Sequence, residues 1–154
     1  MKFNHLNEKR GLDTQPKIAS HFEHFQKLIQ EIDKKEVAEA SIDLINTEID
    51  AINRISEINR ILVNQIRKSR THILRKIEKD HKLVLKGHHR NTWFILGMSV
   101  FGLPLGVAFG SSQGNMGLLG IGMPIGMAMG MAVGAGLDKK AAEEGRQLDL
   151  ESKF

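Results

Sequence analysis

Two pairs of histidines are the residues best suited to bind a metal or to titrate near neutral pH. His21 and His24 lie one helical turn apart, and His88 and His89 are adjacent. The chain has no cysteine, and no nearby pair of carboxylates completes a ligand set. We therefore expect solvated surface histidines, no metal site and no cofactor.

Enzyme chemistry finds little support in the sequence. The chain has no glycine-rich phosphate loop, no nucleophile, histidine and acid in the order of a known triad, and no segment that is expected to be a strand. The apolar part contains no ionisable residue that could relay a proton or hold a charged substrate. These features predict a protein that is not an enzyme.

A basic stretch precedes the apolar part of the chain. Residues 51–90 carry 11 Lys and Arg against 3 Asp and Glu, whereas residues 21–50 carry 8 acids against 3 bases. The stretch either binds anionic lipid headgroups or retains this part of the chain on the cytoplasmic side. Nucleic acid is not an expected partner, because no aromatic residue lies between the bases. The candidate headgroup ligands are Arg67, Lys68, Arg70, Arg75, Lys76, Lys79, Lys82, Lys86 and Arg90.

The apolar part runs for 47 residues, from Asn91 to Leu137, without a formal charge. One crossing of a bilayer needs about 20 residues, so this length predicts two crossings joined by a tight turn. The polar cluster at 111–115 places the turn between spans 93–110 and 116–137. Trp93 is the expected interfacial anchor. Residues 138–154 form a polar C-terminal tail.

A repeat within the two spans is the most informative motif. The sequence GLPLGVAFG, from Gly102 to Gly110, returns 20 residues later as GMPIGMAMG, from Gly122 to Gly130. Glycines spaced by four lie along one helix face and let two backbones approach closely in lipid. They serve either the packing of the hairpin on itself or, as we prefer, packing between chains. The expected packing glycines are Gly102, Gly106, Gly110, Gly122, Gly126, Gly130 and Gly134.

This pattern resembles the glycine-zipper family of membrane proteins over about residues 97–136, roughly a quarter of the chain. The resemblance implies homo-oligomers of glycine-spaced helices, some of which form channels or permeabilise membranes. The two prolines, Pro104 and Pro124, depart from the simplest pattern.

The N-terminal part reads as a flexible lead over residues 1–14, followed by a soluble helical arm over residues 15–87. Apolar residues recur at gaps of three and four, which predicts an amphipathic, coiled-coil-like helix. The stripe shifts sideways at Ser56 and Asn59. The arm is either one rod of about 100 Å or a bundle that folds back near Ala38 to Ser41. The residues expected to assemble the arm with other chains are Ile42, Ile45, Ile49, Ile52, Val63, Ile66, Ile73 and Ile77.

The sequence therefore predicts an all-α protein with a long, coiled-coil-like N-terminal arm and a two-span transmembrane glycine-zipper hairpin. We expect it in the cytoplasmic or inner membrane with both termini in the cytosol, because two crossings return the chain to its starting side. The preferred function is a homo-oligomeric pore or membrane-perturbing assembly, as in a toxin or defence effector. The alternative is a membrane-anchored scaffold or adaptor that recruits a cytosolic protein. Membrane lipid and a second copy of the chain are the other expected partners.

Overall fold

The structure is a computed structural model that describes residues 2–115, 117 and 119–151. It is mostly helical, as expected, and the chain divides into two compact units, Met1–Val84 and Leu85–Phe154. Met116 and Leu118, at the expected start of the second span, lie outside the described residues, as does the end of the tail, residues 152–154.

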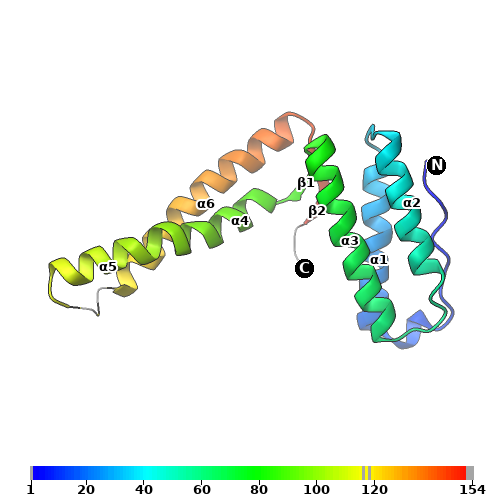
Figure 1. Cartoon of the computed structure of the whole chain (residues 1–154), viewed down its shortest axis with the longest axis horizontal. Helices are drawn as coiled ribbons and strands as arrows, with labels where there is room; N and C mark the ends of the chain where they lie inside the picture. Colours follow the sequence, from blue (N-terminus) through cyan, green and yellow to red (C-terminus); the bar gives the residue numbers. More distant parts are fainter. Residues whose placement is uncertain (1, 116, 118, 152–154) are drawn as a thin grey trace. The chain divides into compact units, whose positions relative to one another are not determined.

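The first unit is a bundle of three helices, α1 (Pro16–Asp33), α2 (Glu39–Asn53) and α3 (Arg60–His81), preceded by the short 3₁₀ turn η1 (Leu12–Thr14). Pro16 lies in the first turn of α1, where a missing backbone N–H costs nothing. Helix α3 packs against both α1 and α2 (Figure 1). The arm is therefore a folded bundle instead of a single rod.

The core of the bundle is an apolar stripe from each helix, spaced by three and four residues so that each stripe occupies one face. The buried side chains are Phe22, Phe25, Leu28 and Ile32 of α1, Ile45, Ile49 and Ile52 of α2, and Leu62, Ile66, Ile73 and Ile77 of α3. Each contributes about 1.5–3 kcal/mol relative to an exposed side chain.

The two turns of the bundle form without glycine or proline. Helix α1 ends at Asp33 and α2 begins at Glu39, close to the fold-back that the sequence offered near Ala38 to Ser41. The second turn coincides with the sideways shift of the stripe, because α3 begins just after Asn59. The Asn59 side chain accepts hydrogen bonds from Ile61 N at 2.8 Å and Leu62 N at 3.4 Å, and so caps α3.

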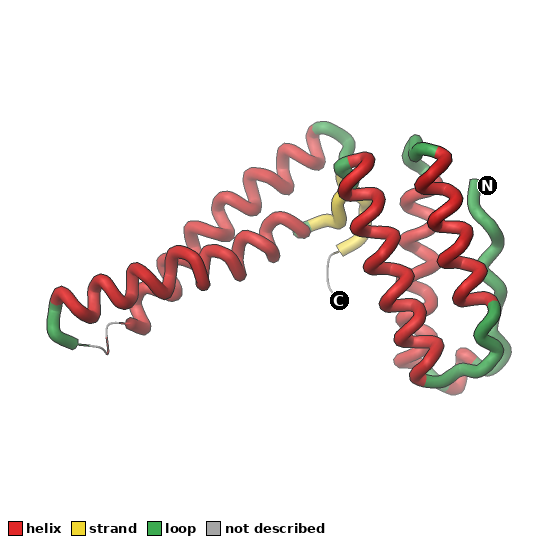
Figure 2. Tube along the Cα trace, viewed as in Figure 1, coloured by secondary structure: helices red, strands yellow, loops and turns green. Residues whose placement is uncertain are grey.

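The N-terminal segment, expected as a flexible lead over residues 1–14, instead lies extended along α2 (Figure 2). Asn4 N donates to Asn46 Oδ1 at 2.7 Å, and Asn7 N donates to Asn53 Oδ1 at 2.9 Å. Phe3 is buried, with 8% of its surface exposed. Side chains of α2 thus accept hydrogen bonds from backbone N–H groups of a segment that does not pair with a strand.

The second unit contains a helical hairpin and a small sheet. Helix α4 (His88–Leu96), the π-helical turn η2 (Gly97–Gly102) and α5 (Leu103–Ser112) follow one another without a break, and α6 (Leu119–Glu143) packs along all three. Strands β1 (Val84–Lys86) and β2 (Gln147–Glu151) pair beside the open end of the hairpin. These short strands were not expected from the sequence.

The hairpin helices extend beyond the spans expected at 93–110 and 116–137. The first continuous helix begins at His88, and α6 continues six residues past Leu137 into the expected polar tail, up to Glu143. Gly87 starts the first helix with φ 74°, a left-handed conformation that suits glycine. The polar ends of both helices therefore lie at the same end of the hairpin.

Candidate membrane interface

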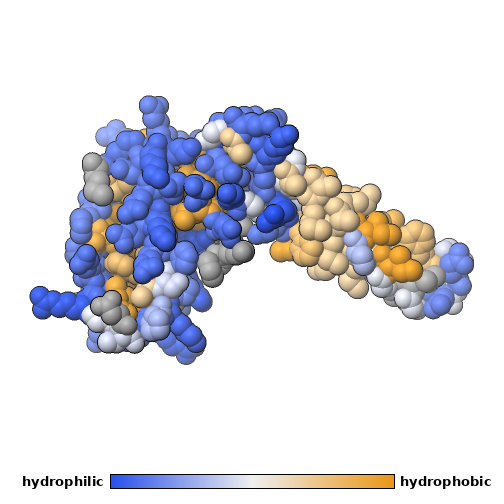
Figure 3. Space-filling view, turned by 180° about the vertical axis from the view of Figure 1, so that it is seen from behind, coloured by the Kyte–Doolittle hydropathy of each residue, from blue (hydrophilic) through white to orange (hydrophobic). Residues whose placement is uncertain are grey.

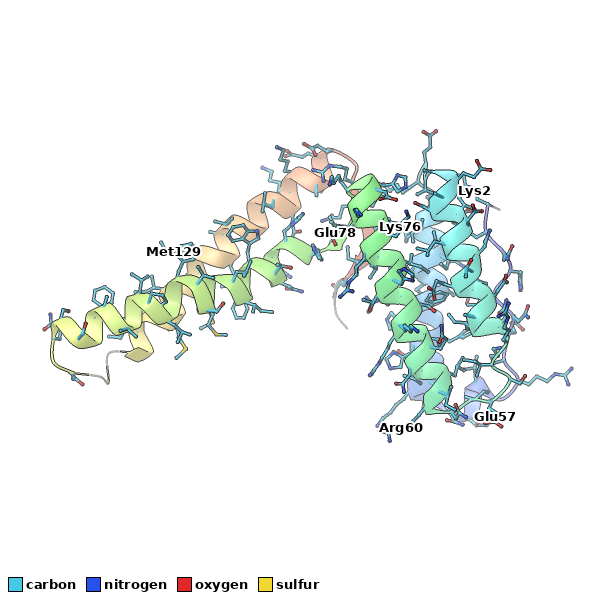
Figure 4. All side chains as sticks on the ribbon, in the orientation of Figure 1. Lys2, Glu57, Arg60, Lys76, Glu78 and Met129 are labelled. Atoms are coloured by element: carbon cyan, nitrogen blue, oxygen red, sulfur yellow. The ribbon has the colours of Figure 1, made fainter. Side chains whose placement is uncertain are left out.

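The outer surface of the hairpin is apolar. Two helices, His88–Ser112 and Gly120–Glu143, are long and apolar enough to span a bilayer, and their most apolar 18-residue windows have mean hydropathies of 1.8 and 1.4. Figure 3 shows apolar residues covering the hairpin arms and hydrophilic residues covering most of the bundle. Met129, labelled in Figure 4, is 53% exposed. The other large apolar side chains exposed on the hairpin are Ile95, Leu96, Val100, Phe101, Leu103, Val107, Phe109, Ile121, Ile125, Met131, Val133 and Leu137.

The interior of the hairpin consists of glycine. Between Asn91 and Leu137, every buried residue that the structure describes is a glycine. The seven glycines expected from the sequence are all buried, and Gly97 is the eighth. Gly97 lies five residues before Gly102 and so does not continue the spacing of four.

The two glycine rows face each other within one chain. A Cβ built on Gly122 would stand 2.6 Å from Gly106 Cα, and one built on Gly126 would stand 2.6 Å from Gly102 Cα. A Cβ on Gly130 would stand 3.1 Å from Gly97 Cα. Real Cβ atoms essentially never lie under 3.0 Å from another heavy atom, so the backbones touch where no side chain larger than hydrogen fits.

The π-helical turn explains how Gly97 joins the row. Hydrogen bonds from i to i+5 widen this turn, so residues five apart, Gly97 and Gly102, lie on the same face. Pro104 follows in the first turn of α5. Proline has no N–H for the preceding turn, and such irregular turns are tolerated in membrane helices. At this turn, therefore, a spacing of five residues places two glycines on the same helix face, where a regular α-helix needs a spacing of three or four.

Asp138 ties the two arms together at the open end of the hairpin. Its Oδ1 accepts from His89 N at 3.0 Å, and its Oδ2 accepts from Arg90 N at 3.0 Å. These are unsatisfied N–H groups in the first turn of α4, where the helix dipole also favours a negative charge. Gly134, one turn earlier in α6, packs against Arg90 Cα. Asp138 was not among the residues expected to be functional, and the one signal for it in the sequence is its place as the first charge after the apolar stretch.

The nine basic candidate ligands differ in exposure and lie on several elements of the two units. Arg67, Lys68, Arg75 and Lys79 are exposed on α3, whereas Arg70 and Lys76 are half-buried. Burial lowers the pKa of Arg70, and Lys76 Nζ pairs with Asp80 Oδ2 at 2.8 Å. This contact holds the pKa of Asp80 below its usual value. Of the remaining three candidates, Lys82 is the C-cap of α3, Lys86 lies in β1 and Arg90 lies in α4.

The residues expected to assemble the arm with other chains lie inside the bundle of one chain. Ile45, Ile49, Ile52, Ile66, Ile73 and Ile77 are at most 2% exposed, while Ile42 and Val63 are half-buried. The stripe of α2 and α3 is covered by the other helices of the same bundle. Periodicity could not distinguish this arrangement from an interface between chains, since both bury the same face.

The histidine pairs have separate environments. Arg67 Nη2 lies 3.4 Å from His21 Nε2, and burial followed by the charges of Arg67, His24 and Arg70 lowers the pKa of His21. The rings of His88 and His89 meet edge to face with centroids 5.3 Å apart. Among the described residues, no group of three His, Cys, Asp or Glu is placed to hold a metal ion.

Comparison of the chain with protein-family models, curated proteins and solved structures gave no match. Function must therefore be inferred from the residues themselves.

Proposed function

We propose that the chain is a membrane-anchored scaffold, in which the hairpin holds the protein in a bilayer and the helical bundle binds a cytosolic partner. One observation favours a scaffold over a pore. The glycine rows and the isoleucine stripe, the two sets of residues suited to join chains, are both buried within a single chain. A single chain that buries both sets of residues can serve as a membrane anchor without forming an oligomer.

The outer face of α3 is the proposed partner surface. Arg60, at the start of the helix in Figure 4, and Arg67, Lys68, Arg75 and Lys79 are exposed on α3. Positions 60, 67, 68, 71, 75 and 79 of a helix fall within one broad face, opposite the buried stripe. Such a face suits an acidic protein surface, which it would attract with a strong dependence on salt.

Both termini are proposed to face the cytosol. Lys86 and Arg90 precede the first helix of the hairpin or lie in its first turn, and Lys139 and Lys140 lie near the end of the second. All four would therefore remain on the cytoplasmic side. The chain has no natural cysteine, so a single cysteine at either end can be labelled from one side of a vesicle without background. Labelling of the two ends from opposite sides would contradict two crossings.

The proposal is tested by the particle mass and by leakage. The full chain, of 17.2 kDa, is reconstituted in liposomes that contain a self-quenched dye and is also weighed in detergent by light scattering. We expect retention in the bilayer after alkaline washing, a protein mass of one chain, and no dye release. A particle of several chains together with dye release would favour the pore.

A pore of several chains is the second candidate, and one observation favours it. A further row of small residues is exposed on α6: Ala128, Ala132 and Gly136 are spaced by four, and Gly120 lies on the same face two turns earlier, with Pro124 between. It lies two residues out of phase with the buried row, and so on the opposite face of the helix. Gly120 and Gly136 have nothing within 4 Å of a built Cβ. If chains assemble, Ala132→Leu should reduce the particle mass, whereas Met129→Leu should not.

A further inference from the structure

A hollow of about 520 Å³ lies at the open end of the hairpin. The beginning of α4, the end of α6 and strand β2 surround it. Its lining includes Lys86 and Arg90 from one side and Lys139 from the other. The hollow thus collects three cations from segments that lie about 50 residues apart in the sequence.

The charges around the hollow leave its cations available to an anion. Asp138 lines it too, but both oxygens of this carboxylate accept backbone N–H groups of α4. Within the described part of the chain, Lys86 and Lys139 make only long ion pairs of 3.8 Å, to Asp149 and Glu143, and such exposed pairs contribute little. The Arg90 guanidinium makes no hydrogen bond or ion pair within the described part of the chain. Among the described lining residues, Glu151 is the one other carboxylate.

The position of the hollow along the hairpin indicates the kind of anion. Arg90 is the last charged residue before the charge-free stretch, and Asp138 is the first one after it. Ala135 lines the hollow from the apolar side. If the charge-free stretch fills the hydrocarbon layer, the three cations lie at the depth of the lipid phosphates. Basic pockets between membrane helices on the cytoplasmic side are suited to acidic headgroups.

We propose that this hollow binds the phosphate of an anionic phospholipid, with Arg90 as the principal ligand and Lys86 and Lys139 beside it. The acyl chains of the lipid lie against the exposed apolar side chains of α4 and α6. The guanidinium fork of Arg90 matches two phosphate oxygens. This inference rests on the proposed insertion of the hairpin in a bilayer.

The test measures lipid retention by the full chain. The protein is reconstituted in nanodiscs of phosphatidylcholine with increasing phosphatidylglycerol, extracted in mild detergent, and its bound phosphatidylglycerol is counted by native mass spectrometry. Arg90→Gln and Lys139→Gln should each weaken retention about five-fold, the effect of about one near-surface charge. Lys140→Gln is the matched control, because Lys140 adjoins Lys139, pairs with Glu144, and does not line the hollow.

A conservative variant separates charge from folding. Arg90→Lys should retain more phosphatidylglycerol than Arg90→Gln, because it keeps the cation. Equal losses in the two variants, or the same loss in Lys140→Gln, would overturn the proposal.

Free phosphate is the other source of the same chemistry. Trp93 is the only tryptophan and lies one turn after Arg90, so its fluorescence reports on the site. In phosphatidylcholine nanodiscs, added phosphatidylglycerol should shift the emission of Trp93, and millimolar inorganic phosphate should not. A saturable shift with inorganic phosphate alone would overturn the assignment to a lipid.

Failure of the membrane anchor and failure of the lipid site give different results. Loss of the wild-type chain from phosphatidylcholine vesicles during alkaline washing would remove the membrane anchor and this inference with it. Retention of the chain with no preference for phosphatidylglycerol would overturn only the lipid site.

Discussion

The bundle and the hairpin both pack helix against helix, but with opposite distributions of residues. In the bundle, isoleucine, leucine and phenylalanine are buried, and charged residues cover the outside. In the hairpin, glycine is buried, and isoleucine, valine, methionine and phenylalanine face outward. In water, burial of apolar surface drives helices together. Lipid offers no such drive, so close contact between backbones must supply the attraction. This difference supports water as the environment of the bundle and lipid as the environment of the hairpin.

Ile49→Asp should have the largest effect, because it places an unpaired charge at a fully buried position of the bundle. We expect a loss of several kcal/mol, a large part of the stability of a small domain. Proteolysis of residues 1–84 in liposomes measures the unfolding, while the hairpin should stay in the bilayer.

Ile61→Asp is the control for this change, because Ile61 is 63% exposed on α3 and its replacement should leave the bundle folded. Equal resistance of the Ile49→Asp and Ile61→Asp variants to protease would mean that the stripe is not the core of the bundle. The same experiment with Ile66→Asp extends the test to α3.

Gly130→Leu sharpens the comparison on the side of the hairpin. It makes α6 more apolar but inserts a side chain where a Cβ alone would lie 2.8 Å from the Trp93 carbonyl carbon. Overpacking of this kind costs about 1–3 kcal/mol. The arms should separate, and spin labels on cysteines that replace Ser99 and Met129 would report a longer and broader distance.

Gly136→Leu is the matched control, because nothing lies within 4 Å of a Cβ at this position. The distance between the spin labels should be unchanged. Tolerance of leucine at Gly126 and Gly130 as well as at Gly136 would refute the role of glycine contacts between the arms.

Asn53→Ala should release the N-terminal segment and leave the three helices intact. The Asn53 side chain accepts from Asn7 N and donates to the His5 carbonyl at 2.9 Å, so the change removes two hydrogen bonds worth about 1 kcal/mol each. Faster hydrogen exchange at the Asn7 amide measures this release. Asn64→Ala, at an exposed position of α3, should have no effect on that amide.

The smallest expected effect concerns His21. Its pKa lies below the ordinary 6.5, because of burial and then because of Arg67. The folded chain therefore binds this proton less well than the unfolded chain. Its contribution to stability is complete above pH 6.5 and decreases as the pH falls to the lowered pKa. Arg67→Gln should raise the pKa of His21, as measured by NMR of the full chain in detergent. An unchanged pKa would exclude the influence of Arg67.

The sequence was most informative where one property repeats over many residues. The stripe through Ile45, Ile49 and Ile52 indicated the buried face of α2, and the charge-free stretch indicated the two long apolar helices. Periodicity cannot say what covers a stripe, so a rod and a folded-back bundle both remained open, and the stripe was predicted to be an interface between chains. The turn at Asn59 appeared in the sequence only as a shift of the stripe, because it uses neither glycine nor proline.

Other features left no periodic pattern at all. The N-terminal segment is held by individual hydrogen bonds in which the side chains of Asn46 and Asn53 accept its backbone N–H groups, and such single contacts leave no periodic signal in the sequence. Gly97 required a π-helical turn that no spacing of four predicts. The strands β1 and β2 are three and five residues long, too short for an alternating pattern to stand out.

The equal spacing of the glycines has a consequence for the register of the hairpin. Displacement of α6 by four residues, about 6 Å along its axis, would again place glycines opposite glycines over most of the row. The rows alone therefore specify how closely the arms approach but leave several registers nearly equivalent. Asp138 removes this degeneracy, since its two oxygens meet the N–H groups of His89 and Arg90 in only one of these registers. A single carboxylate at the end of the hairpin thus favours one alignment of the two glycine rows.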